Sequence, residues 1–526
     1  MKQDKLWKWL FLALWILQLA VEALTVYTIA RLNMLPDQYL WLIVGAFAFL
    51  WILMGLLLLP GKNNAGGIRR GIAAVLILVI CLGCAVMVTV VSDVYETMQG
   101  VLGNRPGEGE DKPKRSVYVL AEDPAQTILD AKEYTFAVVE NFDTANVRQV
   151  LDAIAAEHGE EPQTQAYPSL SAMVDALYAG EVDAVIVSEA NLLILETQDA
   201  YADFHTQARL LYEVEIEEQL PPSVTDPTDP ENPDSTTAPT DEPTEPNATA
   251  PSIMDPQDIT NTPFLVYIAG SDARSYYLNK SRNDVNILAV VNPETKQVLL
   301  INTPRDYYVK NPAGNDARDK LTHCGIYGVE NSVQALANLY GDRVDYYAQI
   351  NFSGFETFID AIGGITVHSD VSFWTSGRDY YISRGENNLD GGAALAFARE
   401  RYALAGGDES RGENQMKVIR AVIQKMTSGS TIITRYAEIL DSLEGMFTTN
   451  LTMDELSLLV KMQLSDMASW NIMTYSVSGY GDSEITYSAP GEELYVMWPD
   501  TEMVAHATEL IDRIIAGEIL TQADLG

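Results

Sequence analysis

Three long apolar runs in the first hundred residues constrain this chain more than any other feature. They cover about residues 6–30, 39–59 and 72–91, and each is long enough to cross a bilayer core of about 30 Å. The first run is too long for a signal peptide and has no small-residue cleavage site, so we interpret it as a membrane span. The sequence therefore predicts three transmembrane helices in residues 1–92.

Basic residues between these runs predict their orientation. They lie before or at the start of the first run and between the second and third: Lys2, Lys5, Lys8, Lys62, Arg69 and Arg70. The positive-inside rule places both regions in the cytoplasm. We therefore expect a multi-pass protein of the cell membrane, with everything after about residue 92 outside. One span followed by a buried hairpin would give the same outcome.

The charge of the chain argues against nucleic acid as a partner. It has 73 acidic and 34 basic residues and a formal net charge of −39, whereas binding phosphates of DNA or RNA takes a basic face. Cysteines indicate little, because Cys81 and Cys84 lie inside an apolar run and Cys324 is isolated. The outer part is therefore not predicted to be a disulfide scaffold.

A segment rich in Pro, Thr and Asp, residues 221–258, divides the outer part in two. It has almost no large apolar residue, so it is predicted to be an extended, disordered linker. An accessory domain is expected before it, over 93–220, and a catalytic domain after it, over 259–518. Residues 519–526 are expected to form a tail.

The accessory domain alternates strand and helix patterns and is predicted to be a small α/β unit, with one helix ending at Gly159. Its phrase "ALYAGEVDAVIV" resembles a lobe of the periplasmic solute-binding proteins, in which a helix leads into a buried strand beside the ligand cleft. Two interpretations stay open, a structural spacer and a ligand-binding unit, and no residue here is assigned to a site.

The second outer domain is predicted to be a sheet covered by helices, an α/β/α arrangement. "NILAVVNPETKQVLLIN" is typical of a β-hairpin that turns at Asn292 and Pro293. "ENSVQALANLYG" predicts a helix closed by Gly341, and "VDYYAQIN" a strand. A further helix is expected to stop at the Gly363–Gly364 pair, before another strand.

Arginines gather in "LAFARERYALAGGDESRGENQ", where Arg399 and Arg401 are two positions apart. They would share a face on an extended chain but not on a helix, so we expect the preceding helix to end at about Ala398. Ser410 and Glu413 then fit a capping box.

That capping box predicts a helix that starts at Arg411, with Gln415 one turn further on. A helix N-terminus with an arginine and a glutamine suits phosphate. The alternative is ordinary surface ion pairing of Arg399 or Arg401 with Glu400, Asp408 or Glu409.

Two other segments favour the phosphate interpretation. "TPRDYY" places Arg305 and Asp306 just after the second strand of the hairpin, where ligand sites of α/β folds collect. Before its first strand, Asp272 and Asp284 lie on either side of Arg282. Two carboxylates beside a phosphate site suit Mg²⁺, although either aspartate alone is also a common turn residue.

Residues 262–518 resemble the LytR–CpsA–Psr (LCP) family of extracytoplasmic phosphotransferases. The matching segments, in order, are "GSDAR", "SRND…ILAVVNPETKQVLLINTPRD", "DKLTHCGIYG", "DYYAQINFSGFETFIDAIGGI" and "LDGGAALAFARERY…GGDESRGENQ". The resemblance implies an LCP-type α/β/α domain behind N-terminal membrane helices. It also implies transfer of a glycopolymer, such as teichoic acid or capsular polysaccharide, from a polyprenyl-pyrophosphate carrier to peptidoglycan.

By position, the resemblance implies a role for each candidate residue. The pyrophosphate would be bound by Arg282, Arg305, Lys320, Arg399, Arg401, Arg411 and Gln415, and Mg²⁺ (or Mn²⁺) by Asp272 and Asp284. Asp284, Arg305, Asp306 and Arg401 would be catalytic, with Asp284 or Asp306 as the base. The chain departs from the family pattern at Thr303, Thr322 and Asn414, and we interpret His323 as structural.

Two other functions are alternatives for this chain. A protein that binds or senses the pyrophosphate lipid without turnover would use the same cations, but it would not need the carboxylates and the metal for a product. A membrane-attached transcription attenuator would need a DNA-reading element in the cytoplasm, and the predicted cytoplasmic parts are short.

Overall fold

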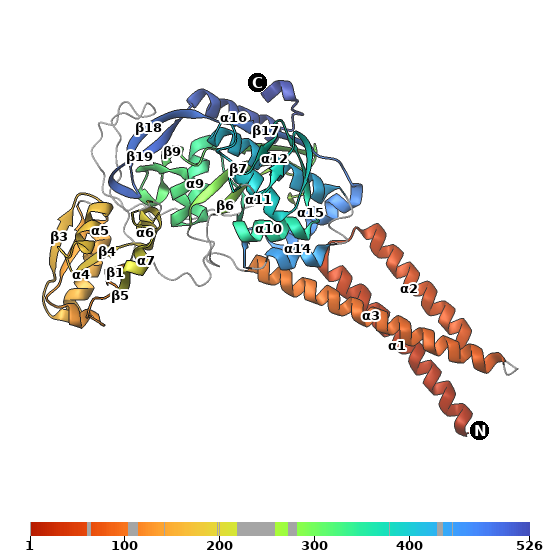
Figure 1. The fold of residues 1–526 in the computed structure, drawn as a ribbon. Coiled ribbons are helices and arrows are strands. Elements are labelled where there is room, and N and C mark those ends of the chain that lie inside the picture. The colour runs from red at the N-terminus through yellow and green to blue at the C-terminus, as the bar shows by residue number, and fades with distance from the viewer. Residues whose placement is uncertain are drawn as a thin grey trace, which may run out of the picture.

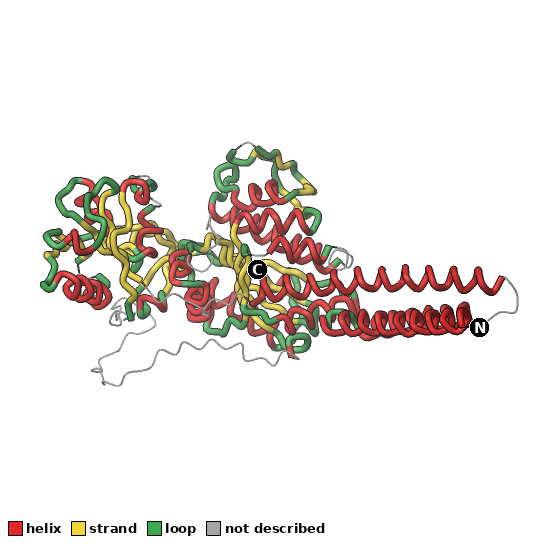
Figure 2. The backbone as a smooth tube through the Cα atoms, turned by 90° about the horizontal axis from the view of Figure 1, so that it is seen from below, coloured by secondary structure: helices red, strands yellow, loops and turns green. Residues whose placement is uncertain are grey.

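The computed structural model describes residues 2–59, 65–103, 114–140, 142–196, 198, 200–217, 258–271, 281–377, 379–428, 435–443 and 445–525. Asp272 and the linker predicted at 221–258, apart from its last residue, lie outside these residues. From here on, residues 114–217 are called the accessory domain and residues 258–525 the C-terminal domain. Figures 1 and 2 show each of these domains as strands with helices packed around them.

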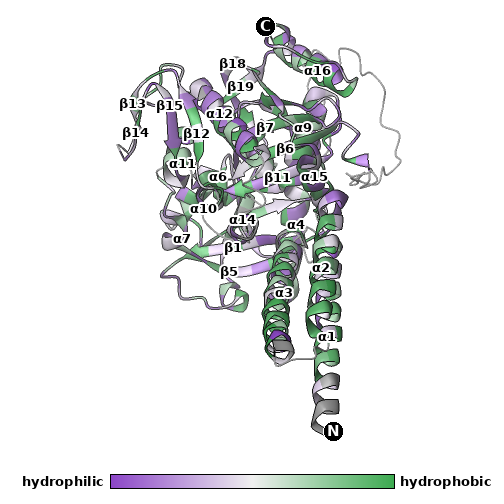
Figure 3. Ribbon diagram, turned by 90° about the vertical axis from the view of Figure 1, so that its right-hand side faces the viewer, coloured by the Kyte–Doolittle hydropathy of each residue, from purple (hydrophilic) through white to green (hydrophobic). Residues whose placement is uncertain are grey.

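Three helices at the N-terminus are long and apolar enough to cross a membrane, and they lie where the three spans were expected. They are α1 (Lys2–Leu32), α2 (Asp37–Leu58) and α3 (Ala65–Gly103). Figure 3 shows predominantly hydrophobic residues along them, and large apolar side chains such as Trp41 and Leu82 are exposed, as expected of a surface that faces lipid. They therefore anchor the chain in a membrane.

The third helix is longer than the apolar run that it contains. It continues past residue 92, where the accessory domain was expected to begin, and ends at Gly103. Val94, Met98 and Leu102 recur every four residues and bury their side chains against Leu456 and Val460 of the C-terminal domain. This apolar stripe keeps the chain helical beyond the apolar run recognised in the sequence. Lys461 adds an ion pair of 2.9 Å to Asp37 at the start of α2.

The accessory domain is a five-stranded sheet in the order β3-β2-β4-β1-β5, with helices packed on it. The parallel strands β2, β3 and β4 end at one edge, where the antiparallel β1 begins. Helix α4 ends at His158 with Gly159 in the left-handed conformation (φ 78°), as expected. The elements are β1 (Lys114–Leu120), β2 (Thr135–Val139), α4 (Thr144–His158), β3 (Gln163–Tyr167), α5 (Leu170–Tyr178), β4 (Ala184–Val187), α6 (Glu189–Leu195), α7 (Phe204–Gln207) and β5 (Ala208–Glu215).

The C-terminal domain is built on a six-stranded mixed sheet in the order β16-β11-β6-β7-β8-β17. The expected hairpin is β7 and β8, and the strand expected at "VDYYAQIN" is β11. The strands are β6 (Phe264–Ser271), β7 (Asn283–Asn292), β8 (Gln297–Asn302), β11 (Tyr346–Asn351), β16 (Phe447–Thr449) and β17 (Asn471–Ser476).

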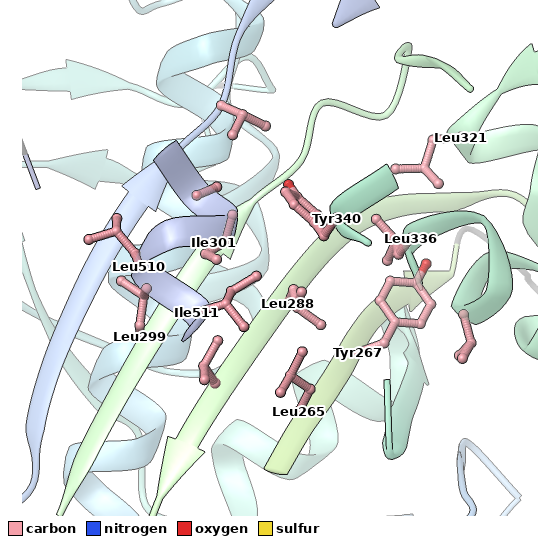
Figure 4. Packing of buried hydrophobic residues seen from close by; sticks show 14 of the residues in the cluster. Leu265, Tyr267, Leu288, Leu299, Ile301, Leu321, Leu336, Tyr340, Leu510 and Ile511 are labelled. Carbon is pink, nitrogen blue, oxygen red and sulfur yellow. The ribbon is translucent and has the colours of Figure 1, made fainter. Parts of the chain in front are cut away.

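Helices cover both faces of this sheet, which confirms the α/β/α layers. Alternate residues of each strand face opposite sides: Leu288 packs with α9 and α16 (Figure 4), whereas Ile287 packs against α12. The apolar strands "NILAVV" and "VLLIN" are thus filled core. The helices are α8 (Leu321–Cys324), α9 (Val329–Tyr340), α10 (Phe352–Ala361), α11 (Gly391–Arg399), α12 (Asp408–Thr427), α14 (Tyr436–Leu443), α15 (Met453–Asp466) and α16 (Thr501–Ile515).

Short hairpins complete the domain. They are β9 (Tyr308–Lys310) with β10 (Arg318–Lys320), β12 (Ile365–Ser369) with β15 (Gly385–Leu389), β13 (Phe373–Trp374) with β14 (Tyr381–Ile382), and β18 (Gly479–Thr486) with β19 (Ala489–Pro499). Residues 519–525, expected as a tail, instead contact the core: Leu520 and Leu525 are buried, and the Leu520 N–H donates to Gln297 Oε1 over 2.8 Å.

Candidate active site

Polar residues gather at one edge of the six-stranded sheet. Strands β6, β8, β11 and β17 run in the same direction, so their carboxyl ends meet at this edge, beside the amino end of the antiparallel β7. Asn302 ends β8, Asn351 ends β11 and Asn283 begins β7. Ligands of open α/β sheets bind beyond the carboxyl ends of the strands, so this edge is the candidate site.

Two carboxylates and two cations form a connected cluster at the edge. Arg305 Nη1 donates to Asp284 Oδ1 over 2.8 Å, and its Nε lies 3.6 Å from Asp306 Oδ2. Lys320 Nζ donates to Asp306 Oδ1 over 3.1 Å. All four side chains are partly exposed, between 14% and 26%. Charges held in place at this depth, yet open to solvent, suit an anionic ligand.

Backbone hydrogen bonds hold the two cations on neighbouring segments. The Thr322 N–H donates to the carbonyl of Arg305, and the Leu321 N–H to that of Tyr307, each over 2.9 Å. The start of α8 is therefore fixed to the chain that follows β8. Because Lys320 directly precedes this helix, its position depends on the same contacts.

The segment between β6 and β7 contributes Arg282, which is half-buried just before β7. Its neighbour Ser281 is hydrogen bonded through Oγ to Ser271 Oγ at the end of β6. Asp272, the next residue, was expected to bind a metal and lies outside the described residues. The structure therefore places Arg282 and Asp284 at the edge. The metal-binding role of Asp272 stays a prediction.

Arg399 and Arg401 are not carried on one extended strand as expected. Helix α11 ends at Arg399, one residue later than expected, and Glu400 after it has extended dihedral angles (φ −65°, ψ 128°). The Arg399 guanidinium lies 4.5 Å from the ring centre of Phe352, the residue after β11, which places it at the site edge. Arg401 is exposed, with its guanidinium 5.8 Å from the ring centre of Tyr402.

Glu400, between the two arginines, is buried and accepts hydrogen bonds from the backbone. Its carboxylate accepts from the N–H groups of Arg401 (3.0 Å), Ala403 (2.9 Å) and Ser376 (2.6 Å), and from the Ser376 hydroxyl. Burial opposes its ionisation, but these hydrogen bonds outweigh burial and hold the pKa of Glu400 below its ordinary value. Glu400 thus fixes the turn that displays both arginines.

The helix expected to begin at Arg411 begins three residues earlier. Helix α12 starts at Asp408 after Gly407, whose φ is 55°, and the Arg411 N–H already donates to the Gly407 carbonyl over 3.1 Å. The capping box of Ser410 and Glu413 was therefore wrong, because a glycine in the left-handed region begins the helix instead. Arg411 lies in its first turn.

The first turns of α12 still lie against the site edge. A side chain at Gly412 would collide with the Asn302 side chain at the end of β8, so glycine is required for this close approach. Arg411 is half-buried and Gln415 is buried on the same helix. The structure therefore brings Arg411 and Gln415 beside the carboxyl end of β8. Asn302 was not singled out from the sequence, because only the packed helix reveals its contact.

Asp319 and His323 form a second buried cluster next to Lys320. His323 Nδ1 is hydrogen bonded to Asp319 Oδ1 over 2.7 Å, and both side chains are buried. This agrees with a structural role for His323. Asp319 was missed, because its contact with Ser488, which lies far along the chain, cannot be recognised from the sequence. Asn311 also donates to Asp319.

The carboxylates fit a magnesium ion with few protein ligands. Mg²⁺ is usually bound by one or two carboxylates, several waters and substrate phosphate oxygens. Within the described residues, no three His, Cys, Asp or Glu side chains gather as a metal cage. Arg305 binds Oδ1 of Asp284, which leaves Oδ2 directed to no hydrogen-bond donor in the described part of the chain. Asp284 can therefore supply an oxygen ligand.

Comparison with known proteins identifies relatives of the C-terminal domain. The polyisoprenyl-teichoic acid–peptidoglycan teichoic acid transferase TagU of Enterococcus faecalis is 34% identical over 196 residues, 37% of this chain and 63% of that protein. The protein of the same name from Oceanobacillus iheyensis is 34% identical over 225 residues, 41% of this chain and 68% of that protein. The chain thus spans about two thirds of the length of these relatives.

Solved structures of related proteins are also similar. B. subtilis TagV is 24% identical, with a TM-score of 0.41, over 49% of this chain and 99% of that chain. A structure of TagT bound to LI-WTA is 25% identical, with a TM-score of 0.41, over 50% of this chain and 93% of that chain. The family model described as the LytR_cpsA_psr family matches residues 232–502, just over half of the chain. This chain belongs to the LytR_cpsA_psr family.

Proposed function

We propose that this chain transfers a glycopolymer, as its sugar 1-phosphate, from a polyprenyl-pyrophosphate carrier to a hydroxyl of peptidoglycan. The observation that carries the proposal is the cluster of Asp284, Arg305, Asp306 and Lys320 at the sheet edge. Family membership and the transferase names of the relatives support it.

The reaction would exchange a phosphoanhydride bond for a phosphate ester bond. The acceptor oxygen forms a bond to the phosphorus next to the sugar, the bond from that phosphorus to the bridging oxygen breaks, and polyprenyl phosphate leaves. Charge grows on the leaving phosphate, so fixed cations that bind it lower the barrier. Arg305 and Lys320 would bind the phosphates directly, and Arg282, Arg399, Arg401, Arg411 and Gln415 would complete the site.

The proton of the acceptor hydroxyl needs a base. Asp284 and Asp306 are the candidates, because both carboxylates lie at the edge within contact of Arg305. Asp284, together with Asp272, would also hold Mg²⁺ (or Mn²⁺), which when bound neutralises charge on phosphate oxygens. Asp306 is then the base that we favour, since its oxygens are not needed for the metal.

The membrane helices would bring the domain to its lipid-linked substrate. The C-terminal domain lies at the α1–α2 connection, where Lys461 contacts Asp37. The basic residues Arg69 and Arg70 lie at the start of α3, which is the other end of that helix from Gly103. The positive-inside rule then places the C-terminal domain outside the cell. Protease added to intact protoplasts should remove residues 221–526, and full protection would contradict this orientation.

A transfer assay tests the function. The full chain is incubated with a short-chain polyprenyl-pyrophosphate glycan, peptidoglycan fragments and Mg²⁺, and products are analysed by mass spectrometry. We expect a glycan–phosphate–peptidoglycan product with wild-type protein, and none with Asp284→Asn, which should still bind the lipid through the cations. Binding without product by the wild type would instead indicate a sensor.

A further inference from the structure

The tip of the β18–β19 hairpin joins the C-terminal domain to the accessory domain. Asn191 Nδ2 donates to the Ser488 carbonyl over 3.0 Å, and the rings of Phe142 and Tyr487 lie 5.7 Å apart. Glu492 accepts from the Ser171 N–H (3.1 Å) and from Gln198 Nε2 (2.7 Å). Figure 1 shows β19 reaching toward the accessory domain beside α6.

This junction is closely fitted. Ile194 of α6 packs with Ile326 and Ala489 of the C-terminal domain, and all three are buried. A side chain at Gly491, whose φ is 77°, would collide with the carbonyl of Pro168. Close packing of this kind fixes the relative position of the two surfaces.

The same hairpin tip is hydrogen bonded to the segment that carries Lys320. The Ser488 hydroxyl donates to Asp319 Oδ2, and the Tyr487 N–H donates to the carbonyl of Arg318 over 3.0 Å. The other oxygen of Asp319 accepts from the Lys320 N–H over 2.8 Å. Ser488 therefore touches the accessory domain through its carbonyl and Asp319 through its hydroxyl.

Asp319 is fully buried, so its carboxylate depends on these donors. Ser488, Asn311, His323 and the Lys320 N–H together satisfy both oxygens. A buried carboxylate that loses a donor must shift or take up water. Either change moves the backbone of Lys320, whose ammonium group contacts Asp306 at the site edge.

We propose that Asp319 is a positioning residue that aims Lys320 at the phosphates, and that the docked accessory domain keeps Asp319 in place through Ser488. This inference rests on the proposed function of the site. It gives the accessory domain a role in transfer that neither a spacer nor an independent ligand-binding unit would have. Release of the hairpin tip then weakens the site without a change in any residue that touches substrate.

A double-mutant cycle on the full chain tests the first part. Asp319→Asn, Lys320→Met and the double variant are assayed with the short-chain polyprenyl-pyrophosphate glycan, peptidoglycan fragments and Mg²⁺. We expect Asp319→Asn to lower kcat/KM about 10-fold when Lys320 is present, and less than about 2-fold in the Lys320→Met background. Equal losses in the two backgrounds would show a merely structural role and overturn the proposal.

Ser488→Ala tests the hydrogen bond from the hairpin tip to Asp319 without loss of a buried charge, and Ser483→Ala on the exposed part of the same hairpin is its matched control. Asn191→Ala removes the hydrogen bond from the accessory domain to the Ser488 carbonyl, and it should lower kcat/KM in the same Lys320-dependent way. Ser488→Ala should lower kcat/KM about 3- to 10-fold through one lost hydrogen bond, and only when Lys320 is present. Ser483→Ala should change nothing. Wild-type transfer by Ser488→Ala, or an equal loss with Lys320→Met, overturns this link.

Failure of the proposed function would look different. The wild type would then bind the lipid and give no product. If the wild type transfers but Lys320→Met and Arg305→Lys do so at the same rate, the site lies elsewhere and the inference falls with it. If instead these two variants lose activity but the cycle is additive, the site stands and only the positioning role is overturned.

Discussion

Arg115 of the accessory domain and Arg305 of the C-terminal domain occupy matching places but differ in burial. Each lies at the sheet edge where parallel strands end, and each binds an aspartate: Arg115 Nε to Asp143 over 2.6 Å, and Arg305 Nη1 to Asp284 over 2.8 Å. The side chains of the first pair are 10% exposed, and those of the second 26% and 23%.

This difference separates a structural arginine from one that can reach a ligand. Arg115 and Asp143 neutralise each other in the interior, and Asn146 Nδ2 also donates to Asp143 over 2.6 Å. Arg305 shares its charge between two carboxylates that remain open to solvent. An ion pair at a sheet edge is therefore no sign of a site unless its members stay accessible.

The largest expected effect is on stability, in the accessory domain. Arg115→Ala leaves Asp143 buried without its cation, and breaking a buried pair in this way costs about 3–5 kcal/mol. Amide exchange in β1, β2 and β4 should accelerate accordingly. Exchange at the wild-type rate would show that the pair is not structural, and the comparison with Arg305 would fail.

The next effect is on transfer. Arg305→Lys retains the charge but loses the planar fork that binds phosphate through two parallel hydrogen bonds. We expect a loss of about 2–4 kcal/mol in transition-state stabilisation, measured as kcat/KM, with little change in melting temperature because Arg305 is partly exposed. Arg401→Lys should also reduce transfer. The matched control is Arg148→Lys, at an exposed ion pair of the accessory domain, which should leave kcat/KM unchanged.

Sequence patterns were sufficient for most of the fold. Two apolar runs around a turn at Asn292 and Pro293 located β7 and β8, and Gly341 and Gly159 marked helix ends correctly, because these signals are local. The start of α12 was missed because the S-x-x-E spacing of Ser410 and Glu413 also occurs inside a helix that has already begun. Gly407, which precedes the helix, has no side chain that would mark it as a cap. Likewise, Val94, Met98 and Leu102 continue α3 only because a surface of the C-terminal domain is there to cover them.

The site was predictable to the extent that it depends on strand ends. Arg305, Asp306 and Asp284 flank a hairpin recognisable from sequence, so their meeting at one edge followed from topology. Asp319 was not predictable, since a fully buried carboxylate is identified only by its donors, and Ser488 lies far along the chain. No local pattern reports such a contact.

A smaller effect on stability is expected for the buried carboxylate of Glu400 in the C-terminal domain. Glu400→Gln keeps one acceptor oxygen where the carboxylate uses two, and we expect a loss of about 1–3 kcal/mol in stability at pH 7. The pKa of Glu400 is lower in the folded than in the unfolded protein, so its contribution is present above the ordinary pKa and lost as the pH falls through the folded value. The melting temperatures of the wild type and of Glu400→Gln should therefore converge as the pH is lowered. A difference that stays constant with pH would contradict this.

The smallest effect is expected for an exposed arginine of the accessory domain. Arg148 pairs with Asp152 and Glu161, each over 2.8 Å, but its side chain is 55% exposed. Water and salt screen such pairs, so Arg148→Ala should leave the melting temperature and transfer unchanged. A loss as large as that of Arg115→Ala would show that burial does not rank these arginines.

The length of α3 has a mechanical consequence. Its 39 residues extend about 58 Å at 1.5 Å per residue, roughly twice the thickness of a bilayer core. The helix packs directly on the C-terminal domain without a break, so as a membrane span it would act as a rigid stalk and not as a tether. Membrane spans adjust their tilt to bilayer thickness. A change in lipid composition would therefore swing the whole C-terminal domain relative to the plane in which its lipid-linked substrate diffuses.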